Sequence, residues 1–271
     1  MSRWIRILLV LALAFAGLVF GVRALERALT FHPAAFDAAN LRWQPPAGTE
    51  EFWIPSPAGK KLHCWLIRPP EDELGVILYS HGNGGNLTNV RSLAELVSEK
   101  KFAMIVWDYP GYGRSDGPLP ADEDELFASA AAVYDFFSRR QKKPLYVWGQ
   151  SLGTTVSANL CTVRPCRALV MESGLSSARH YAETRVPWIP TALHVFAVNR
   201  FESAEKLGRV RCRLLIAHGT ADRTIDYSHG QILFAQAAEP KHLLTVPDGT
   251  HWLAASPGYV EQVTAFLAAV P

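Results

Sequence analysis

The chain has 271 residues, of which 49% are hydrophobic and 19% charged, and its formal net charge at pH 7 is +2. This length suits one domain with a large apolar core. The nearly balanced charge gives no reason to expect nucleic acid or another polyanion as a partner, and we find no repeat of fixed period.

The first predicted element is a long apolar helix. Residues 7–22 contain no charged side chain, and arginines flank them on both sides. At about 1.5 Å per residue this run is roughly 24 Å long, slightly less than the ~30 Å hydrocarbon core of a bilayer, and its neighbours extend it. We therefore divide the chain into a membrane anchor or signal segment at 1–25, a linker at 26–50 and a globular domain at 51–271.

We favour a single N-terminal membrane anchor over two other interpretations of this segment. Ala14-Phe15-Ala16 has the small-x-small form of a signal cleavage site, but the apolar run continues beyond it. A buried helix of a soluble protein is the third interpretation. Arginine counts on the two sides hardly differ, and the free amino terminus favours the N-terminus inside. The domain is then expected on the non-cytoplasmic side, with secretion after signal cleavage as the alternative.

Beyond residue 50, apolar runs alternate with helical segments. The predicted strands are residues 51–55, 61–68, 75–80, 102–107, 145–148, 168–171, 212–217 and 241–246. The predicted helices are residues 87–100, 121–140, 152–161, 227–238 and 257–270. The first two strands form an antiparallel pair, and the alternation that follows predicts an α/β fold whose mostly parallel central sheet has helices on both faces. Functional sites in such sheets lie at the carboxyl ends of the strands.

The most informative stretch is Gly149-Gln150-Ser151-Leu152-Gly153. It is a G-x-S-x-G pattern between a strand and a helix, which is the context of a nucleophile elbow. The serine of such an elbow has a positive φ, and side chains two positions away would clash with the tight turn. Because glycines occupy both of those positions, we predict that Ser151 is a nucleophile at the positive end of the following helix.

A serine hydroxyl is a weak nucleophile and needs a general base, which in turn needs an orienting acid. Asp222 lies a few residues beyond the strand at 212–217, and His251 lies beyond the strand at 241–246. The order Ser, Asp, His is one of those known for serine hydrolases. We predict that Asp222 is the acid and His251 the base, with Asp226 as the alternative acid.

Charge that develops on a substrate oxygen requires backbone N–H donors nearby. Leu152 follows the predicted nucleophile and fits the first donor, and Asn83 in the glycine-rich loop at 81–86 fits the second. This loop lacks the Gly-Lys-Ser/Thr ending of a P-loop and the G-x-G-x-x-G spacing, so we expect no nucleotide and no cofactor. We expect Asp108 to fix its own loop.

The four cysteines match no zinc or redox motif by their spacing, and we predict no metal site. Cys64 and Cys212 lie in strand-like runs, and we expect them to be buried as small hydrophobic residues. Cys161 and Cys166 are near enough in sequence for a disulfide in an oxidising compartment.

Three motifs together resemble the α/β-hydrolase superfamily, namely HGNxGN from His81, DYxGYGxS from Asp108 and GxSLG from Gly149. The resemblance covers about residues 51–271. It implies a serine hydrolase of carboxylic esters or thioesters, and some similar members are membrane-tethered and remove acyl chains from proteins or lipids. The implied triad is Ser151, Asp222 and His251, and the implied oxyanion-hole donors are Asn83 and Leu152. A small cap is implied after the sixth strand, at about 173–207.

We therefore expect cleavage of a small-molecule or lipid-like acyl ester through an acyl-enzyme intermediate. One alternative is a peptidase or amidase of aminopeptidase type, and the other is a non-catalytic binding module. An aminopeptidase needs acidic groups near the cap, where the chain offers Glu183, Glu202 and Glu205. Candidates for an acyl pocket in the cap are Trp188, Val195, Phe196 and Phe201.

Overall fold

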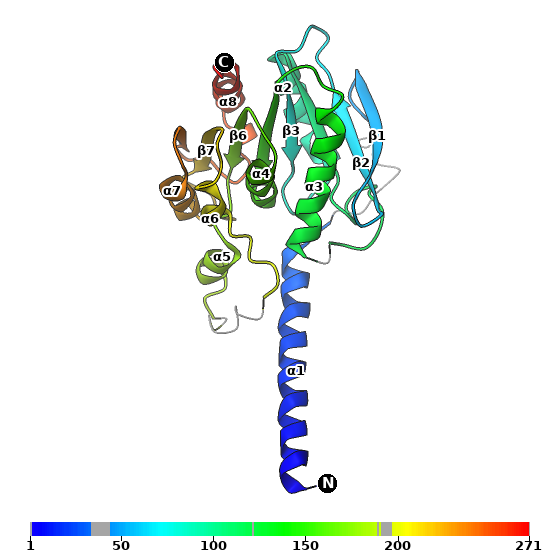
Figure 1. Ribbon diagram of the computed structural model, residues 1–271. Helices are drawn as coiled ribbons and strands as arrows, with labels where there is room; N and C mark the ends of the chain where they lie inside the picture. Colours follow the sequence, from blue (N-terminus) through cyan, green and yellow to red (C-terminus); the bar gives the residue numbers. More distant parts are fainter. Residues whose placement is uncertain (1, 34–43, 121, 189, 191–196, 271) are drawn as a thin grey trace.

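An eight-stranded sheet forms the centre of the molecule in the computed structural model, which describes residues 2–33, 44–120, 122–188, 190 and 197–270 (Figure 1). The strands are β1 (Thr49–Pro55), β2 (Lys61–Ile67), β3 (Gly75–Ser80), β4 (Phe102–Trp107), β5 (Leu145–Gln150), β6 (Ala168–Glu172), β7 (Arg213–Gly219) and β8 (Lys241–Val246). Their order is β1-β2-β4-β3-β5-β6-β7-β8, and every pair from β4 to β8 is parallel. The predicted mostly parallel sheet is confirmed.

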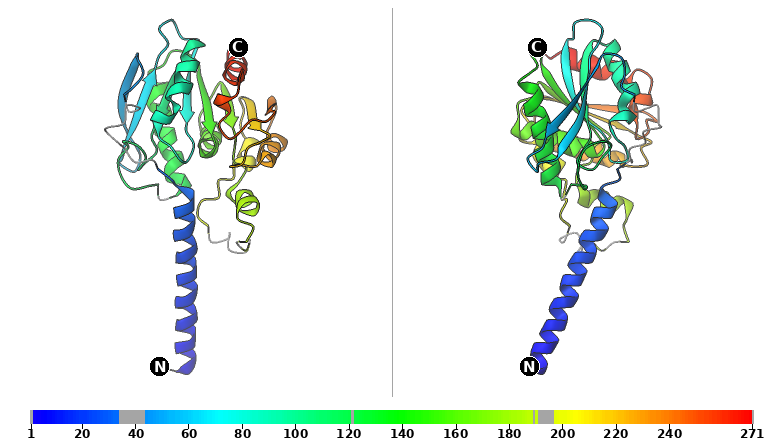
Figure 2. Two further views of the ribbon diagram at one scale, coloured as in Figure 1. Left: turned by 180° about the vertical axis from the view of Figure 1, so that it is seen from behind. Right: turned by 90° about the vertical axis from the view of Figure 1, so that its right-hand side faces the viewer.

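Helices cover both faces of this sheet (Figure 2). They are α2 (Arg91–Glu99), α3 (Glu123–Ser138), α4 (Leu152–Val163), α5 (Ala178–Arg185), α6 (Ser203–Leu207), α7 (Tyr227–Gln236) and α8 (Tyr259–Ala268). Buried side chains of α2 and α8 pack with one face of the sheet, and those of α3, α4, α6 and α7 pack with the other. Because both faces are covered, β3, β4 and β6 are buried along their whole length, which explains why their sequences are continuous apolar runs.

The N-terminal helix α1 (Arg3–Thr30) projects away from the sheet and its helices (Figures 1 and 2). Its segment Arg3–Glu26 is long and apolar enough to cross a membrane, a property that a signal sequence shares, and none of its most apolar stretch is buried in the fold. The interpretation as a buried helix of a soluble core is therefore wrong. The helix continues beyond residue 25 to Thr30, and no proline interrupts it before that point.

The segment before α6 contacts the C-terminal part of this helix. The Glu26 carboxylate accepts hydrogen bonds from the backbone N–H of Val198 at 2.9 Å and from both the backbone and side-chain nitrogens of Asn199, at 2.8 and 2.6 Å. These three hydrogen bonds join α1 to the segment that leads into α6. Helix α5 lies on the same side of the sheet as α1 (Figures 1 and 2).

Two local expectations differ from the structure. The predicted helix at 87–100 begins as a turn of 3₁₀ helix, η2 (Leu87–Val90), because the Asn86 side chain accepts a hydrogen bond from Thr88 N–H at 2.9 Å and caps it. Cys64 is buried as expected, whereas Cys212 is only half-buried because it lies just before the first residue of β7.

Candidate active site

Ser151 occupies the turn between β5 and α4 with φ 54° and ψ −120°. A Cβ atom at Gly149 would stand 2.3 Å from the carbonyl oxygen of Gly153, and one at Gly153 would stand 1.9 Å from the carbonyl oxygen of Ser80. Neither position has room for a side chain. The turn therefore has the positive φ and the steric requirement predicted for an elbow.

The end of β6 and the start of α4 flank this turn. The Ser151 N–H donates a hydrogen bond of 2.9 Å to the carbonyl oxygen of Glu172 at the end of β6. On the other side, Leu152 begins α4, whose first N–H groups have no partner within the helix. The N–H of Leu152 thus lies where the helix dipole favours negative charge.

His251 and Asp222 are hydrogen-bonded to each other, with 2.8 Å between Nδ1 and Oδ2. The other carboxylate oxygen of Asp222 accepts from the N–H groups of Thr224 and Ile225, at 2.8 and 3.0 Å. Burial alone would raise the pKa of Asp222, but hydrogen bonds from His218 and His251 outweigh it and hold this pKa well below its usual value. Asp222 is therefore an ionised partner that orients the imidazole.

Asp226, the alternative acid, has a different role. Its carboxylate accepts from Ser228 N–H at 2.9 Å and caps the N-terminus of α7. Asp222 has a second histidine beside it, because His218 Nε2 lies 3.4 Å from the Asp222 carboxylate and 3.0 Å from the carbonyl oxygen of Ile225. His218 is fully buried and thus braces the acid from inside the fold.

Ser151, Leu152, Asn83 and His251 line one cavity of about 640 Å³. Asp222 lies behind His251, and its side chain is buried. Segments far apart in the sequence complete the wall, among them Thr30, His32, Val90, Leu175, Ala178, Tyr181, Phe201, Ile225 and Trp252. The structure thus brings four of the five predicted site residues to one cavity and holds the fifth against His251.

The loop at 81–86 is held from two directions at Asn83. The Asn83 side-chain oxygen accepts from the backbone N–H of His32 at 3.0 Å and from the hydroxyl of Tyr112 at 2.8 Å. His81 is buried, its ring stacks on Tyr109 with 4.1 Å between ring centres, and its carbonyl oxygen accepts from the Tyr109 hydroxyl. The chain after α1 and the Asp108–Ser115 loop therefore both position this glycine-rich loop.

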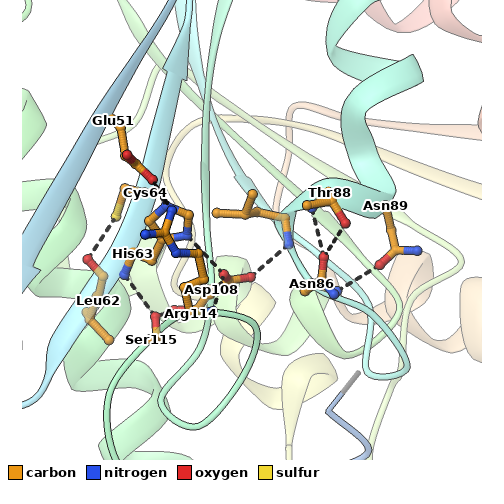
Figure 3. A network of polar contacts seen from close by, with 11 residues as sticks. Glu51, Leu62, His63, Cys64, Asn86, Thr88, Asn89, Asp108, Arg114 and Ser115 are labelled. Atoms are coloured by element: carbon orange, nitrogen blue, oxygen red, sulfur yellow. Dashed lines mark hydrogen bonds and ion pairs between the residues drawn. The ribbon is translucent and has the colours of Figure 1, made fainter. Parts of the chain in front are cut away.

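Asp108 is fully buried and joins three segments (Figure 3). One carboxylate oxygen accepts from Leu87 N–H at 2.7 Å, and the other accepts from Arg114 N–H at 3.1 Å and lies 3.2 Å from Nδ1 of His63. Glu51 contacts the other ring nitrogen of His63 at 2.5 Å. Asp108 fixes loops, as expected, and the first turn of η2 is one of the elements it fixes.

Sequence reasoning missed two residues that hold the His251 loop. The Gln150 side-chain nitrogen donates to the carbonyl oxygen of His251 at 3.3 Å, and the carboxylate of Glu172 accepts from Leu253 N–H and from Trp148 Nε1, each at 3.1 Å. Burial raises the pKa of Glu172 to about 7. A charged residue that ends a buried apolar strand is the signal that could have identified it.

The three cap glutamates considered for an aminopeptidase line a second, separate cavity of about 440 Å³. None of them is among the described residues that line the Ser151 cavity. Of the candidate acyl-pocket residues, Phe201 lines that cavity, Trp188 is 75% exposed, and Val195 and Phe196 lie outside the described residues.

Residues 75–206 match the family profile described as the alpha/beta hydrolase fold. The chain is 30% identical over 225 residues to the uncharacterized protein YfhR of Salmonella typhi, which covers 76% of this chain and 75% of that protein. It is also 30% identical to the alpha/beta hydrolase domain-containing protein aho-3 of Caenorhabditis elegans over 212 residues, 76% of this chain. This chain spans 61% of the length of the C. elegans protein.

The fold resembles that of a Pyrococcus furiosus esterase, with a TM-score of 0.71 over 89% of this chain and 97% of the esterase. A second esterase, Est1E of Butyrivibrio proteoclasticus with bound ferulic acid, gives a TM-score of 0.64 over 80% of this chain and 96% of its own. Sequence identities to these two are 14% and 19%, so the similarity concerns the fold.

Proposed function

The chain belongs to the α/β-hydrolase superfamily, and we propose that it is a serine hydrolase that cleaves carboxylic esters or thioesters through an acyl-enzyme intermediate. One observation carries this proposal. Ser151, at a strained elbow, and His251, hydrogen-bonded to an ionised Asp222, line the same cavity. These are the three groups that nucleophilic catalysis by serine requires.

In the proposed reaction His251 Nε2 takes the proton of the Ser151 hydroxyl as its oxygen attacks the substrate carbonyl. Asp222 keeps the proton of His251 on Nδ1, which leaves Nε2 free to accept, and it stabilises the imidazolium. The imidazolium then protonates the leaving alcohol or thiol. Water attacks the acyl-enzyme with the same base, and the acid is released as Ser151 recovers its proton.

We assign the oxyanion hole to the backbone N–H groups of Leu152 and Asn83. Support for Leu152 comes from its position at the start of α4, and support for Asn83 from the bonds that fix its side chain and from its place on the cavity wall. A preorganised donor of this kind contributes about 3–4 kcal/mol to the stability of the transition state.

A lipid-like acyl ester is the substrate class that the cavity favours. Apolar side chains from η2, the cap and the Ile225 loop form much of its wall, and Thr30 and His32 at the end of α1 complete it. If α1 spans a bilayer as we propose, the cavity opens beside the membrane surface, where acyl chains are concentrated. We place the catalytic domain on the non-cytoplasmic side.

Labelling with a fluorophosphonate tests the proposal, because this reagent reacts with activated serines. We expect strong labelling of the wild type and of Ser98→Ala, a partly exposed serine of α2, and none of Ser151→Ala. Equal labelling of Ser151→Ala and wild type would refute the nucleophile. Rates on p-nitrophenyl esters from acetate to palmitate, on an acyl thioester and on amino-acid anilides then define the substrate, and a preference for anilides would mean a peptidase.

A further inference from the structure

Three cysteines from separate segments lie together at the amino-terminal ends of the parallel strands, whereas the Ser151 cavity lies at their carboxyl ends. Cys161 lies in the last turns of α4, Cys166 lies in the turn before β6, and Cys212 directly precedes β7. Since β6 and β7 are adjacent and parallel, their first residues lie side by side at the same end of the sheet. Ser151 follows the last residue of β5, at the opposite end of the parallel strands.

The Cys166 sulfur is in contact with both other sulfurs. It lies 2.7 Å from Cys161 Sγ and 2.8 Å from Cys212 Sγ, and all three sulfurs lie within 4.8 Å of one another. Cys161 is buried, whereas Cys166 and Cys212 are partly exposed. Two of the three cysteines therefore lie at the protein surface.

These separations favour sulfur–sulfur bonding over metal binding. Zinc–sulfur bonds of about 2.3 Å would keep the sulfurs of one site about 3.7–4 Å apart. A disulfide has a length of about 2.05 Å, so Cys166 needs to approach either neighbour by only about 0.7 Å to form one. The two contacts of Cys166 are thus shorter than the sulfur–sulfur separations in a zinc site and nearer to the length of a disulfide.

The three thiols of the cluster differ in their electrostatic surroundings. Hydrogen bonds from Cys161 and Cys166 lower the pKa of the Cys212 thiol, whereas burial raises the pKa of Cys161. The direction of this shift, together with its partial exposure, makes Cys212 the thiol that we expect to react first, because a thiolate is the form of cysteine that attacks a disulfide. Its partial exposure gives a small molecule access to it.

We propose that Cys161, Cys166 and Cys212 form a thiol–disulfide exchange site that reacts with small-molecule disulfides. The Cys212 thiolate attacks one sulfur of the small disulfide, forms a mixed disulfide and releases one thiolate. Cys166 then loses its proton and attacks Cys212 Sγ, which forms the Cys166–Cys212 bond and releases the second thiolate. In total, two protein thiols are oxidised and one small disulfide is reduced to two thiols.

The product bond joins the start of β6 to the start of β7. It closes a loop that contains α5, α6 and the cap segment at 173–207, so oxidation is expected to stabilise the fold. Cys161 is the alternative partner of Cys166, because its attack on Cys166 would release Cys212 as a thiolate again.

The test treats the reduced full-length protein, in detergent, with oxidised glutathione and maps its cysteines by mass spectrometry. We expect the wild type to form a Cys166 disulfide, with Cys64 still reduced as an internal control because it is fully buried. The double variant Cys161→Ser, Cys166→Ser lacks both resolving thiols and should accumulate glutathione on Cys212. If this variant does not fold, the double variant Cys161→Ala, Cys166→Ala takes its place.

Wild-type protein that keeps all three thiols reduced would overturn the proposal, as would a double variant that takes up no glutathione at Cys212. Binding of one Zn²⁺ by the reduced wild type, with its thiols then protected from glutathione disulfide, would identify a metal site instead. The Ser151→Ala variant should react like the wild type, so this result is independent of hydrolase activity.

Discussion

Glu172 accepts the N–H of Ser151 on its carbonyl oxygen at 2.9 Å, while its carboxylate accepts the N–H of Leu253, two residues after His251. One residue at the end of β6 thus holds both the predicted nucleophile and the loop of the predicted base. Its carboxylate is fully buried and has no cationic partner among the groups that bond it. This has a consequence for stability as a function of pH.

We expect the contribution of Glu172 to the free energy of unfolding to fall as pH rises from about 5 to 8. The pKa of Glu172 is about 7 in the fold and 4.5 as its ordinary value, so the folded state binds the extra proton in this window. Ionising the buried carboxylate at the upper end costs up to about 3 kcal/mol. Urea unfolding at several pH values should show that wild type loses stability relative to Glu172→Gln as pH rises, since the contributions of other groups cancel in this difference. The difference between wild type and Glu99→Gln, an exposed residue of α2, should stay constant. Parallel profiles of wild type and Glu172→Gln would contradict this.

Asp222→Asn should lower kcat for ester hydrolysis by roughly 10⁴-fold, because an amide favours the wrong imidazole tautomer. Asp226→Asn is the matched control, since Asp226 caps α7 and does not bond His251. Steady-state kinetics on a p-nitrophenyl ester measure both. If Asp226→Asn loses the activity and Asp222→Asn keeps it, the acid is wrongly assigned.

Gly153→Ala should destabilise the fold by about 3 kcal/mol, because its Cβ would stand 1.9 Å from the carbonyl oxygen of Ser80, a backbone atom that cannot move aside. Gly84→Ala is the control, because a Cβ there meets nothing within 4 Å. Thermal unfolding of the two variants decides the matter. Equal midpoints would mean that the elbow tolerates a methyl group.

Tyr112→Phe removes the hydroxyl that donates to the Asn83 side chain at 2.8 Å. Without this hydrogen bond the Asn83 loop is less well positioned, and the transition state should lose about 1 kcal/mol of stabilisation. We expect kcat to fall roughly 5-fold with little change in KM, because an oxyanion donor acts in the transition state. Tyr134→Phe, whose hydroxyl donates to the carbonyl oxygen of Pro165, is the control. An unchanged kcat for Tyr112→Phe would show that this hydroxyl does not help to position the proposed oxyanion donor.

Deleting Arg3–Glu26 should move the protein from the membrane fraction to the soluble fraction. The reason is that the exposed apolar side chains of α1 are the surface that a bilayer would cover. Fractionation after carbonate washing measures this. N-terminal sequencing of the full-length product gives the alternative result, since a mature chain that begins after Ala16 would mean a cleaved signal.

The local sequence determined most of the fold. Strands of a doubly covered parallel sheet are apolar along their whole length, so β3, β4 and β6 could be recognised directly. The elbow could be predicted too, because the whole G-x-S-x-G pattern lies within five residues, but the clash that excludes a side chain at Gly153 comes from Ser80 at the end of β3. The roles of Ser151, Asp222, His251, Asn83 and Leu152 stay predictions that the experiments above test.

Only the tertiary structure decided which distant side chains meet. Glu172 reaches the His251 loop, and Cys212 reaches Cys166, because β6 lies between β5 and β7, an order that the chain sequence does not state. In the same way, the cap glutamates fall in a second cavity, and Glu26 of α1 bonds the segment before α6. Such contacts depend on strand order and on the docking of loops, whereas apolar periodicity acts within a few residues.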